Sequence, residues 1–216
     1  MATHCFEILL QEKFPKSLPE VIIVYGDDGF LRRECSARIL KHAGVDSEMT
    51  RTFDGEECAW IDVHDELATL SLFAENERRV ATVIAADKLV KDARAQIEKW
   101  CTKPAPDSLL VLQVNTLPAN TKLFKTADKN GWCVQCSLPT TSPRSKTPDL
   151  KKLKEWITTW SNRELGLKLT ATQANQVLDA VGSDCGLLHQ ELSKLALYTD
   201  GNGKISNESM RQNMGT

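Results

Sequence analysis

The sequence has no apolar run that approaches the roughly 18 residues needed to cross a bilayer. Its start has no basic region before a short apolar patch, and a secretory signal opens on positive charge. We therefore expect neither a membrane partner nor export, and we expect a cytoplasmic protein. The two signs of charge nearly balance, because the formal net charge is only -2. Bulk charge therefore gives no indication of binding to nucleic acid or to a membrane surface.

The seven cysteines form no complete set of four closely spaced metal ligands. An odd number of cysteines without an export signal indicates reduced thiols in a cytosolic compartment. Cys133 and Cys136 have the spacing of a zinc half-site or a redox pair, but a tetrahedral zinc site needs two further ligands, and none is near. Residues 131–136 instead look like a strand with the two thiols on opposite faces. No nucleophile has a plausible base either, so we expect no metal, no cofactor and no catalytic residue.

The sequence does contain aliphatic runs that alternate with helical patterns. Five short segments are typical of strands: residues 21–25, 50–53, 79–86, 109–114 and 132–136. The first, third and fourth are nearly continuous aliphatic runs, as expected of strands that are buried on both faces. Helical patterns cover residues 30–42 and 89–100. Because strands alternate with helices, the sequence predicts an α/β domain with a five-stranded parallel sheet flanked by helices.

The alternation stops near Leu138. Residues 138–149 (LPTTSPRSKTPD) hold three prolines with serine, threonine and basic residues, which is typical of a linker. Only helical patterns follow. One covers residues 153–160, a second opens at Thr170, and a third follows Ser183 or Asp184, either of which suits an N-cap. The turn at residues 200–204 ends the third, and residues 205–212 are expected to begin another helix. We therefore predict three regions: an α/β domain over residues 1–140, a linker over 141–149 and a helical domain over 150–216.

The stretch VIIVYGDDGFLRRE, residues 21–34, has the strand-turn-helix order in which nucleotide-binding folds keep a phosphate loop. Such a loop reads G-x-x-x-x-G-K-[ST], in which lysine and the hydroxyl serve the terminal phosphate and Mg²⁺. After Gly26 this sequence has the carboxylates Asp27 and Asp28 and no Lys-Ser or Lys-Thr pair. A pair of anions near 4 Å costs about 1 to 4 kcal/mol. We therefore expect no nucleotide binding, and we expect Asp27 or Asp28 to cap the helix.

The second acidic motif of such enzymes is also incomplete. The segment RRVATVIAAD ends in Asp87, but Lys88 follows where a glutamate would activate water. These residues indicate the skeleton of a nucleotide-binding fold without its active site. A divergent P-loop-type ATPase or nucleotide kinase stays an alternative, and a phosphate cradle is the feature that would distinguish it.

Four segments in order resemble the delta subunit of the bacterial DNA polymerase III clamp loader: YGDDGFLRRE, LATLSLFAENERRV, SLLVLQV and ANQVLDAVGSDCGLLHQELSKLALY. The resemblance implies an AAA+-like, P-loop ATPase-type α/β domain, a three-helix lid, and a helical collar domain that would begin near Thr216. Members of this family do not hydrolyse ATP. They are accessory subunits of a DNA-directed DNA polymerase holoenzyme, and they bind and open the sliding clamp. The implied partners are therefore the sliding clamp (beta) and, through the collar, the other clamp-loader subunits.

The resemblance places the clamp contacts on Leu70, Leu72 and Phe73. The residues supply an independent argument, because three large apolar side chains lie between the end of a helical pattern and the polar residues 75–79. Apolar clusters at a loop tip are costly to solvate and usually mark a partner site. The alternative is that Leu70 and Phe73 fold inward as core. With the resemblance, partner contact is favoured for Leu72 and Phe73, whereas both interpretations stay open for Leu70.

A local basic patch surrounds the predicted linker: Arg144, Lys146, Lys151, Lys152 and Lys154. A solvated helix face and linker explain such a patch without any ligand. The functional alternative is weak contact between these side chains and the DNA backbone. It would make the protein a DNA-binding replication or repair factor, and the salt dependence of DNA affinity would distinguish that alternative.

Overall fold

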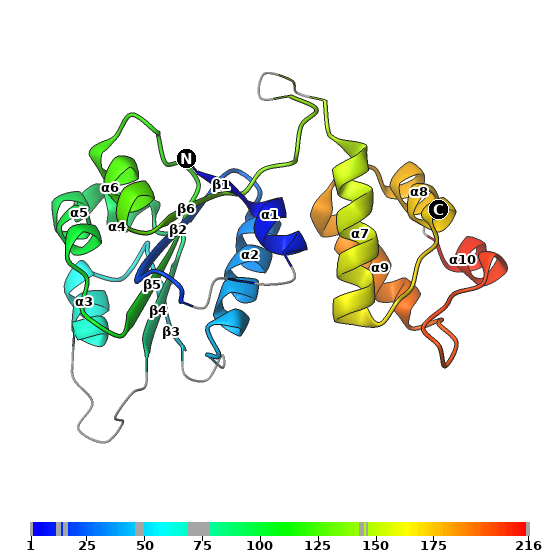
Figure 1. Ribbon diagram of the computed structural model, residues 1–216, viewed down its shortest axis with the longest axis horizontal. Helices are drawn as coiled ribbons and strands as arrows, with labels where there is room; N and C mark the ends of the chain where they lie inside the picture. Colours follow the sequence, from blue (N-terminus) through cyan, green and yellow to red (C-terminus); the bar gives the residue numbers. More distant parts are fainter. Residues whose placement is uncertain are drawn as a thin grey trace. The chain divides into compact units, whose positions relative to one another are not determined.

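The computed structural model describes residues 2–11, 14, 17–45, 50–68, 78–142, 145 and 147–214 (Figure 1). The chain divides into two compact units, Met1–Ile8 with Glu12–Ser137, and Leu9–Gln11 with Leu138–Thr216. The first unit is built on a sheet and the second is helical. Among the described residues, every helix is too short or too polar to span a bilayer.

In the described residues, the first unit holds a six-stranded sheet in the order β1–β6–β2–β5–β4–β3 (Figure 1). All neighbouring strands are parallel. The strands are β1 (Thr3–His4), β2 (Val21–Tyr25), β3 (Thr50–Asp54), β4 (Arg79–Ile84), β5 (Ser108–Val114) and β6 (Trp132–Gln135). The parallel sheet is confirmed, but the predicted number of five strands is wrong. Strand β1 was missed because two residues are too few to show a period.

Helices cover both faces of this sheet (Figure 1). On one face lie α3 (Trp60–Ala68), α4 (Asp87–Asp92), α5 (Arg94–Thr102) and α6 (Lys122–Asn130), and their apolar residues share a core with β2, β4 and β5. On the other face lie α1 (Cys5–Leu10) and α2 (Gly29–His42). Every residue of β5 is buried, which explains its continuous aliphatic run. The single helix predicted over residues 89–100 is two helices, α4 and α5, which meet at Ala93.

The described part of the second unit holds four helices: α7 (Leu150–Leu165), α8 (Ala171–Val181), α9 (Cys185–Ala196) and α10 (Asn207–Asn213). The first three correspond to the predicted lid helices, and α10 overlaps the further helix predicted over residues 205–212. Its N-cap, Ser206, accepts a hydrogen bond from the Ser209 amide at 3.0 Å.

The core of the helical unit contains two tryptophans on one side of α7. Trp156 and Trp160 are both buried, and their ring centroids lie 5.9 Å apart. The Trp160 ring also lies 4.7 Å from the ring of His189, which belongs to α9. Asp184, and not Ser183, caps α9 by accepting from the Leu187 amide at 2.9 Å. The aromatic rings thus join α7 to α9.

Candidate functional site

The turn after β2 has the position of a phosphate loop, at the carboxyl end of a central strand. Gly26 has a φ of +143°, and a Cβ there would lie 1.9 Å from the Cys136 carbonyl oxygen. The Gly26 amide donates to the Val114 carbonyl at 3.3 Å, and the Gly26 carbonyl accepts from Arg32 Nη1. A phosphate loop offers its amides to the ligand. Here Gly26 bonds to neighbouring protein groups instead.

Of the two carboxylates in this turn, Asp28 is the one that caps α2. Its Oδ1 accepts from the Leu31 amide at 2.9 Å, and its backbone has the extended conformation of an N-cap. The start of a helix attracts anions because its first amides are unpaired and its dipole end is positive. Asp28 supplies that negative charge from the protein itself, in the place where a phosphate would bind.

Asp87, at the start of α4, fixes the turn that follows β5. Its two carboxylate oxygens each lie 3.0 Å from the Asn115 amide, and Oδ2 also accepts from Asn115 Nδ2 at 3.0 Å. The Thr116 amide is 3.4 Å from Oδ1. The neighbouring Lys88 donates through Nζ to the Glu56 carbonyl at 2.6 Å. Both side chains of this motif therefore form hydrogen bonds with backbone groups of neighbouring turns.

The C-x-x-C cysteines contact different helices. Cys133 donates to the Phe124 carbonyl in α6 at 3.8 Å, and burial raises the pKa of its thiol to about 12. A hydrogen bond with the Cys35 thiol, together with burial, raises the pKa of Cys136, which also contacts Cys5. No group of three or more potential metal ligands is arranged to hold an ion in the part of the chain that the structure describes. All seven cysteines are free thiols.

The predicted partner contacts Leu70, Leu72 and Phe73 lie outside the described residues. The structure does describe the chain on either side of them, because α3 ends at Ala68 and β4 begins at Arg79. The end of α3 and the start of β4 both lie at the amino end of the parallel strands, whereas the turn after β2 lies at their carboxyl end. These flanking residues are the part of the candidate site that can be described.

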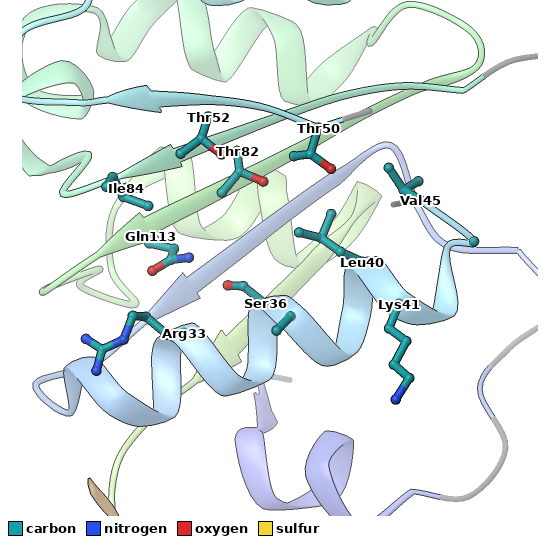
Figure 2. Close-up of a pocket in the computed structure, with 12 residues that line it drawn as sticks. Arg33, Ser36, Leu40, Lys41, Val45, Thr50, Thr52, Thr82, Ile84 and Gln113 are labelled. Carbon is teal, nitrogen blue, oxygen red and sulfur yellow. The ribbon is translucent and has the colours of Figure 1, made fainter. Parts of the chain in front are cut away.

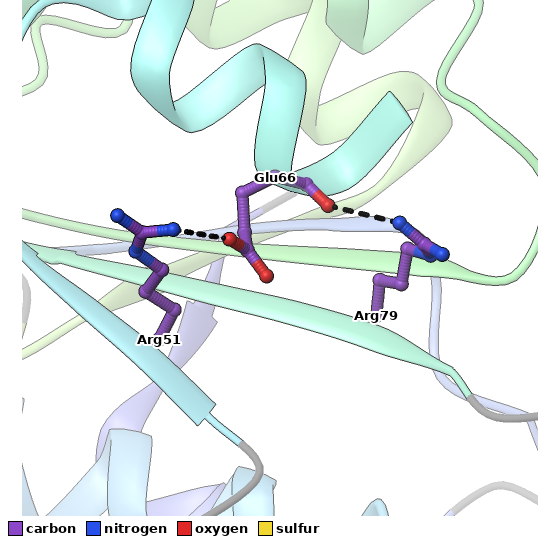
Figure 3. Close-up of polar contacts among 3 residues, drawn as sticks. All are labelled: Arg51, Glu66 and Arg79. Carbon is purple, nitrogen blue, oxygen red and sulfur yellow. Dashed lines mark hydrogen bonds and ion pairs between the residues drawn. The ribbon is translucent and has the colours of Figure 1, made fainter. Parts of the chain in front are cut away.

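Glu66 joins the end of α3 to two strands (Figure 3). Its carboxylate pairs with Arg51 of β3, with 2.8 Å between Nη1 and Oε2, and its backbone carbonyl accepts from Arg79 Nη1 at 3.4 Å. Arg51 is largely exposed, so the ion pair itself adds little stability. The packing of α3 is stronger, because Val63 and Leu67 are buried in the core. The chain before residue 69 is therefore held in place.

The chain after residue 77 is held by Arg78. Its Nη2 donates to the Leu18 and Pro19 carbonyls at 3.0 and 2.9 Å, and its Nε donates to the Ser108 carbonyl at 3.2 Å. Burial lowers the pKa of the Arg78 guanidinium, and three backbone carbonyls compensate for its lost hydration. The Arg79 amide donates a further hydrogen bond to the Asp107 carbonyl, in the turn before β5, at 2.8 Å. Both ends of the candidate segment are thus anchored.

The basic patch is described only in part. Lys151 and Lys152 are exposed in the first turn of α7, and Lys154 is half-buried. Arg144 and Lys146 lie outside the described residues. Asp149 caps α7 by accepting from the amides of the two exposed lysines at 3.1 and 3.2 Å. The described lysines fit a solvated helix face, and DNA contact stays a prediction.

The sequence profile of one protein family, described as DNA polymerase III, delta subunit, matches residues 22–137. This span covers more than half of the 216 residues. It includes the turn after β2, Asp87 and the whole segment between α3 and β4. A search of curated protein sequences gives no match.

Solved structures share the fold at low sequence identity. The Bacillus subtilis DNA clamp loader delta protein YqeN is 19% identical with a TM-score of 0.66, over 90% of this chain and 58% of that chain. The Thermotoga maritima RuvB Holliday junction branch migration motor is 12% identical with a TM-score of 0.52, over 90% of this chain and 61% of that chain. This chain therefore spans less than two thirds of either one. At these identities the likeness shows the fold alone.

Proposed function

The chain belongs to the DNA polymerase III delta subunit family, and from this premise we propose that it binds a ring-shaped sliding clamp and opens it for loading onto DNA. The observation that carries the proposal is the family match over residues 22–137, which includes the segment between α3 and β4. In this proposal Leu70, Leu72 and Phe73 are the clamp contacts. A few apolar anchors that enter a pocket supply most of the affinity in many interfaces.

The anchoring on either side of the segment supports this role. Association has to offset the entropy lost when interface residues become ordered, and a held base reduces that loss. Val63 and Leu67 pack the preceding helix into the core, and Arg78 ties the following residues to three backbone carbonyls. In this proposal, a clamp bound to the segment between α3 and β4 is therefore connected to the sheet through both ends of the segment. Opening a closed ring requires such a rigid connection between the contact residues and the rest of the protein.

In this proposal the chain acts as an accessory subunit without chemistry of its own. The support lies in Asp28 and Asp87, whose carboxylates accept hydrogen bonds from the backbone in the two places where a nucleotide enzyme keeps its phosphate and metal groups. The other clamp-loader subunits are proposed as further partners, through the collar domain that the family implies. The chain spans 58% of YqeN, so loader assembly is a proposal about the whole protein.

Two titrations of the purified chain test the proposal. Calorimetry with a bacterial sliding clamp should give saturable binding without ATP, and a donor-acceptor dye pair across the clamp interface should report separation of the ring. A second titration, with ATP and Mg²⁺, should give no heat of binding. The absence of clamp binding would contradict the proposal. A micromolar ATP affinity with turnover would instead support the divergent nucleotide enzyme.

A further inference from the structure

The sheet face that packs against α2 is covered unevenly. Side chains alternate along a strand, and Phe53, Ala81 and Val83 belong to the core on the opposite face. Thr52 of β3 and Thr82 of β4, which are paired directly in the sheet, therefore project to the α2 side. Figure 2 shows these threonines facing a space between the strands and α2.

A cavity of about 540 Å³ occupies this space. Helix α2 lines one wall, and strands β3, β4 and β5 line the other (Figure 2). Pockets that hold small molecules measure roughly 300 to 1,000 Å³ and combine apolar walls with a few polar groups. The cavity lies on the face of the sheet, apart from the turn after β2 and from the segment between α3 and β4. Neither the family match nor the proposed clamp contacts assign it a role.

Two hydroxyl groups in the wall of the cavity have no hydrogen-bond partner among the described residues. Ser36 of α2 is 2% exposed and Thr82 is 5% exposed, and no described group lies within hydrogen-bonding reach of either side-chain oxygen. Buried polar groups are nearly always paired, because an unpaired one loses its hydration without compensation. Gln113 of β5, which is 8% exposed, brings its amide to the same end of the cavity (Figure 2). These groups point to an occupant with hydrogen-bonding oxygens.

The charges and apolar residues of the wall define the occupant further. Arg33 and Lys41 line the cavity, and no aspartate or glutamate is among the described residues that do so. Arg33 lies near the end that holds Ser36 and Gln113, whereas Leu40 and Val45 lie toward the other end (Figure 2). One end therefore suits a negatively charged, oxygen-bearing group, and the other suits an apolar body.

We propose that this cavity is a binding site for a small organic anion that carries a carboxylate or a phosphate group on an apolar body. The hydroxyl oxygens of Ser36 and Thr82 are covered in the structure, and rotation of these side chains brings them to the polar end of the occupant, where they donate hydrogen bonds. Arg33 complements the charge of that end. Leu40 and Val45 contact the apolar body. The site is independent of the clamp-binding proposal, because its lining residues come from α2 and the sheet face.

Two-dimensional NMR of the full chain tests the site with three probes: octanoate, octyl phosphate and, as the neutral probe, 1-octanol. One or both anions should shift the signals of Ser36, Thr82 and Gln113 saturably, with a dissociation constant of roughly 1 mM or tighter. The stronger anion identifies the polar group as carboxylate or phosphate. The neutral alcohol should bind at least about fivefold more weakly, because it lacks the charge that Arg33 complements. The absence of saturable shifts, or shifts confined to other parts of the chain, would overturn the proposal.

Thr82→Val removes one unpaired hydroxyl while it keeps the shape of the side chain. It should weaken binding of the better anion by at least about fivefold and should raise the Tm of the free protein by roughly 2 to 4 °C, because the unpaired group is gone. Thr52→Val is the matched control, since Thr52 lines the same cavity but is exposed, and it should change neither quantity appreciably. Ser36→Ala repeats the test from the helix side if Thr82→Val does not fold. Unchanged anion affinity in the folded variant would overturn the site.

Discussion

The two ends of the parallel sheet use their polar residues differently. At the carboxyl end, Asp28 and Asp87 accept backbone hydrogen bonds from α2 and from the turn after β5. At the amino end of β4, the buried Leu67 and the hydrogen bonds of Arg78 hold the chain on either side of the predicted clamp contacts. Open α/β sheets usually bind ligands beyond the carboxyl ends of their strands. In our proposal, the polar residues at the carboxyl end of this sheet only stabilise the fold, and the clamp binds at the opposite end.

The largest effect should come from Gly26→Ala at the carboxyl end. The new Cβ would meet the Cys136 carbonyl oxygen, and the φ of +143° excludes other residues. We expect a loss of about 3 to 5 kcal/mol in the free energy of unfolding, measured by urea denaturation. Gly44→Ala is the control, because its φ is +68° but nothing lies within 4 Å, so about 1 to 2 kcal/mol is expected. Equal losses would show that the carboxyl end is not tightly packed.

Asp87→Ala should have the next largest effect. It removes the acceptor for the amides of Asn115 and Thr116, so we expect a loss of about 2 kcal/mol in the free energy of unfolding. Asp92→Ala, at the exposed end of the same helix, should change stability by less than about 0.5 kcal/mol. Clamp affinity should not change in either variant. A selective loss of clamp binding in folded Asp87→Ala would mean that the two ends are not separate in function.

Asp28→Ala should cost about 1 kcal/mol of stability, because the α2 N-cap is lost. Asp27→Ala is the matched control and should cost less than about 0.5 kcal/mol, since Asp27 does not cap the helix. Urea denaturation of both variants under one condition gives the comparison. A larger loss of stability for Asp27→Ala than for Asp28→Ala would show that Asp28 is not the residue that caps α2.

The reactivity of the cysteine thiols tests the packing of the wild-type protein without any substitution. Six of the seven cysteines are buried and Cys58 is half-buried. Burial raises the pKa of Cys101 and of Cys133 to about 12, so near pH 8 almost none of either is the reactive thiolate. Ellman's reagent should therefore modify Cys58 first, and the other six should react only after unfolding. Rapid native reaction of several thiols would contradict the packing described here.

The sequence predicted those parts of the fold whose signals are local. Five strands were predicted from short segments rich in apolar or β-branched residues. The helix start at Thr170 was predicted from the apolar pattern that follows it, and the start at Ser183 or Asp184 from their capping side chains. The choice between Asp27 and Asp28 needed the backbone, because both residues precede α2. The role of Asp87 could not be predicted, since its partner Asn115 is 28 residues away in sequence.

The cavity beside α2 was missed for a related reason. Threonine is β-branched and fits any strand, so Thr52 and Thr82 gave no sign that their face of the sheet is only partly covered. Ser36 likewise fits a helix, and its burial without a partner depends on the packing of α2 against the sheet. Leu70, Leu72 and Phe73 stay a prediction from the sequence and the family resemblance.

The central claim is tested most directly by one double variant, Leu72→Ala with Phe73→Ala, in which clamp affinity and Tm are measured on the same preparation. If these side chains are the anchors, affinity should fall by about 3 kcal/mol or more, and the Tm should stay within about 2 °C. Ile61→Ala, an apolar α3 residue that is 58% exposed, should change neither quantity. A large fall in Tm would instead place the two side chains in the core. Unchanged clamp affinity in the folded double variant would contradict the account.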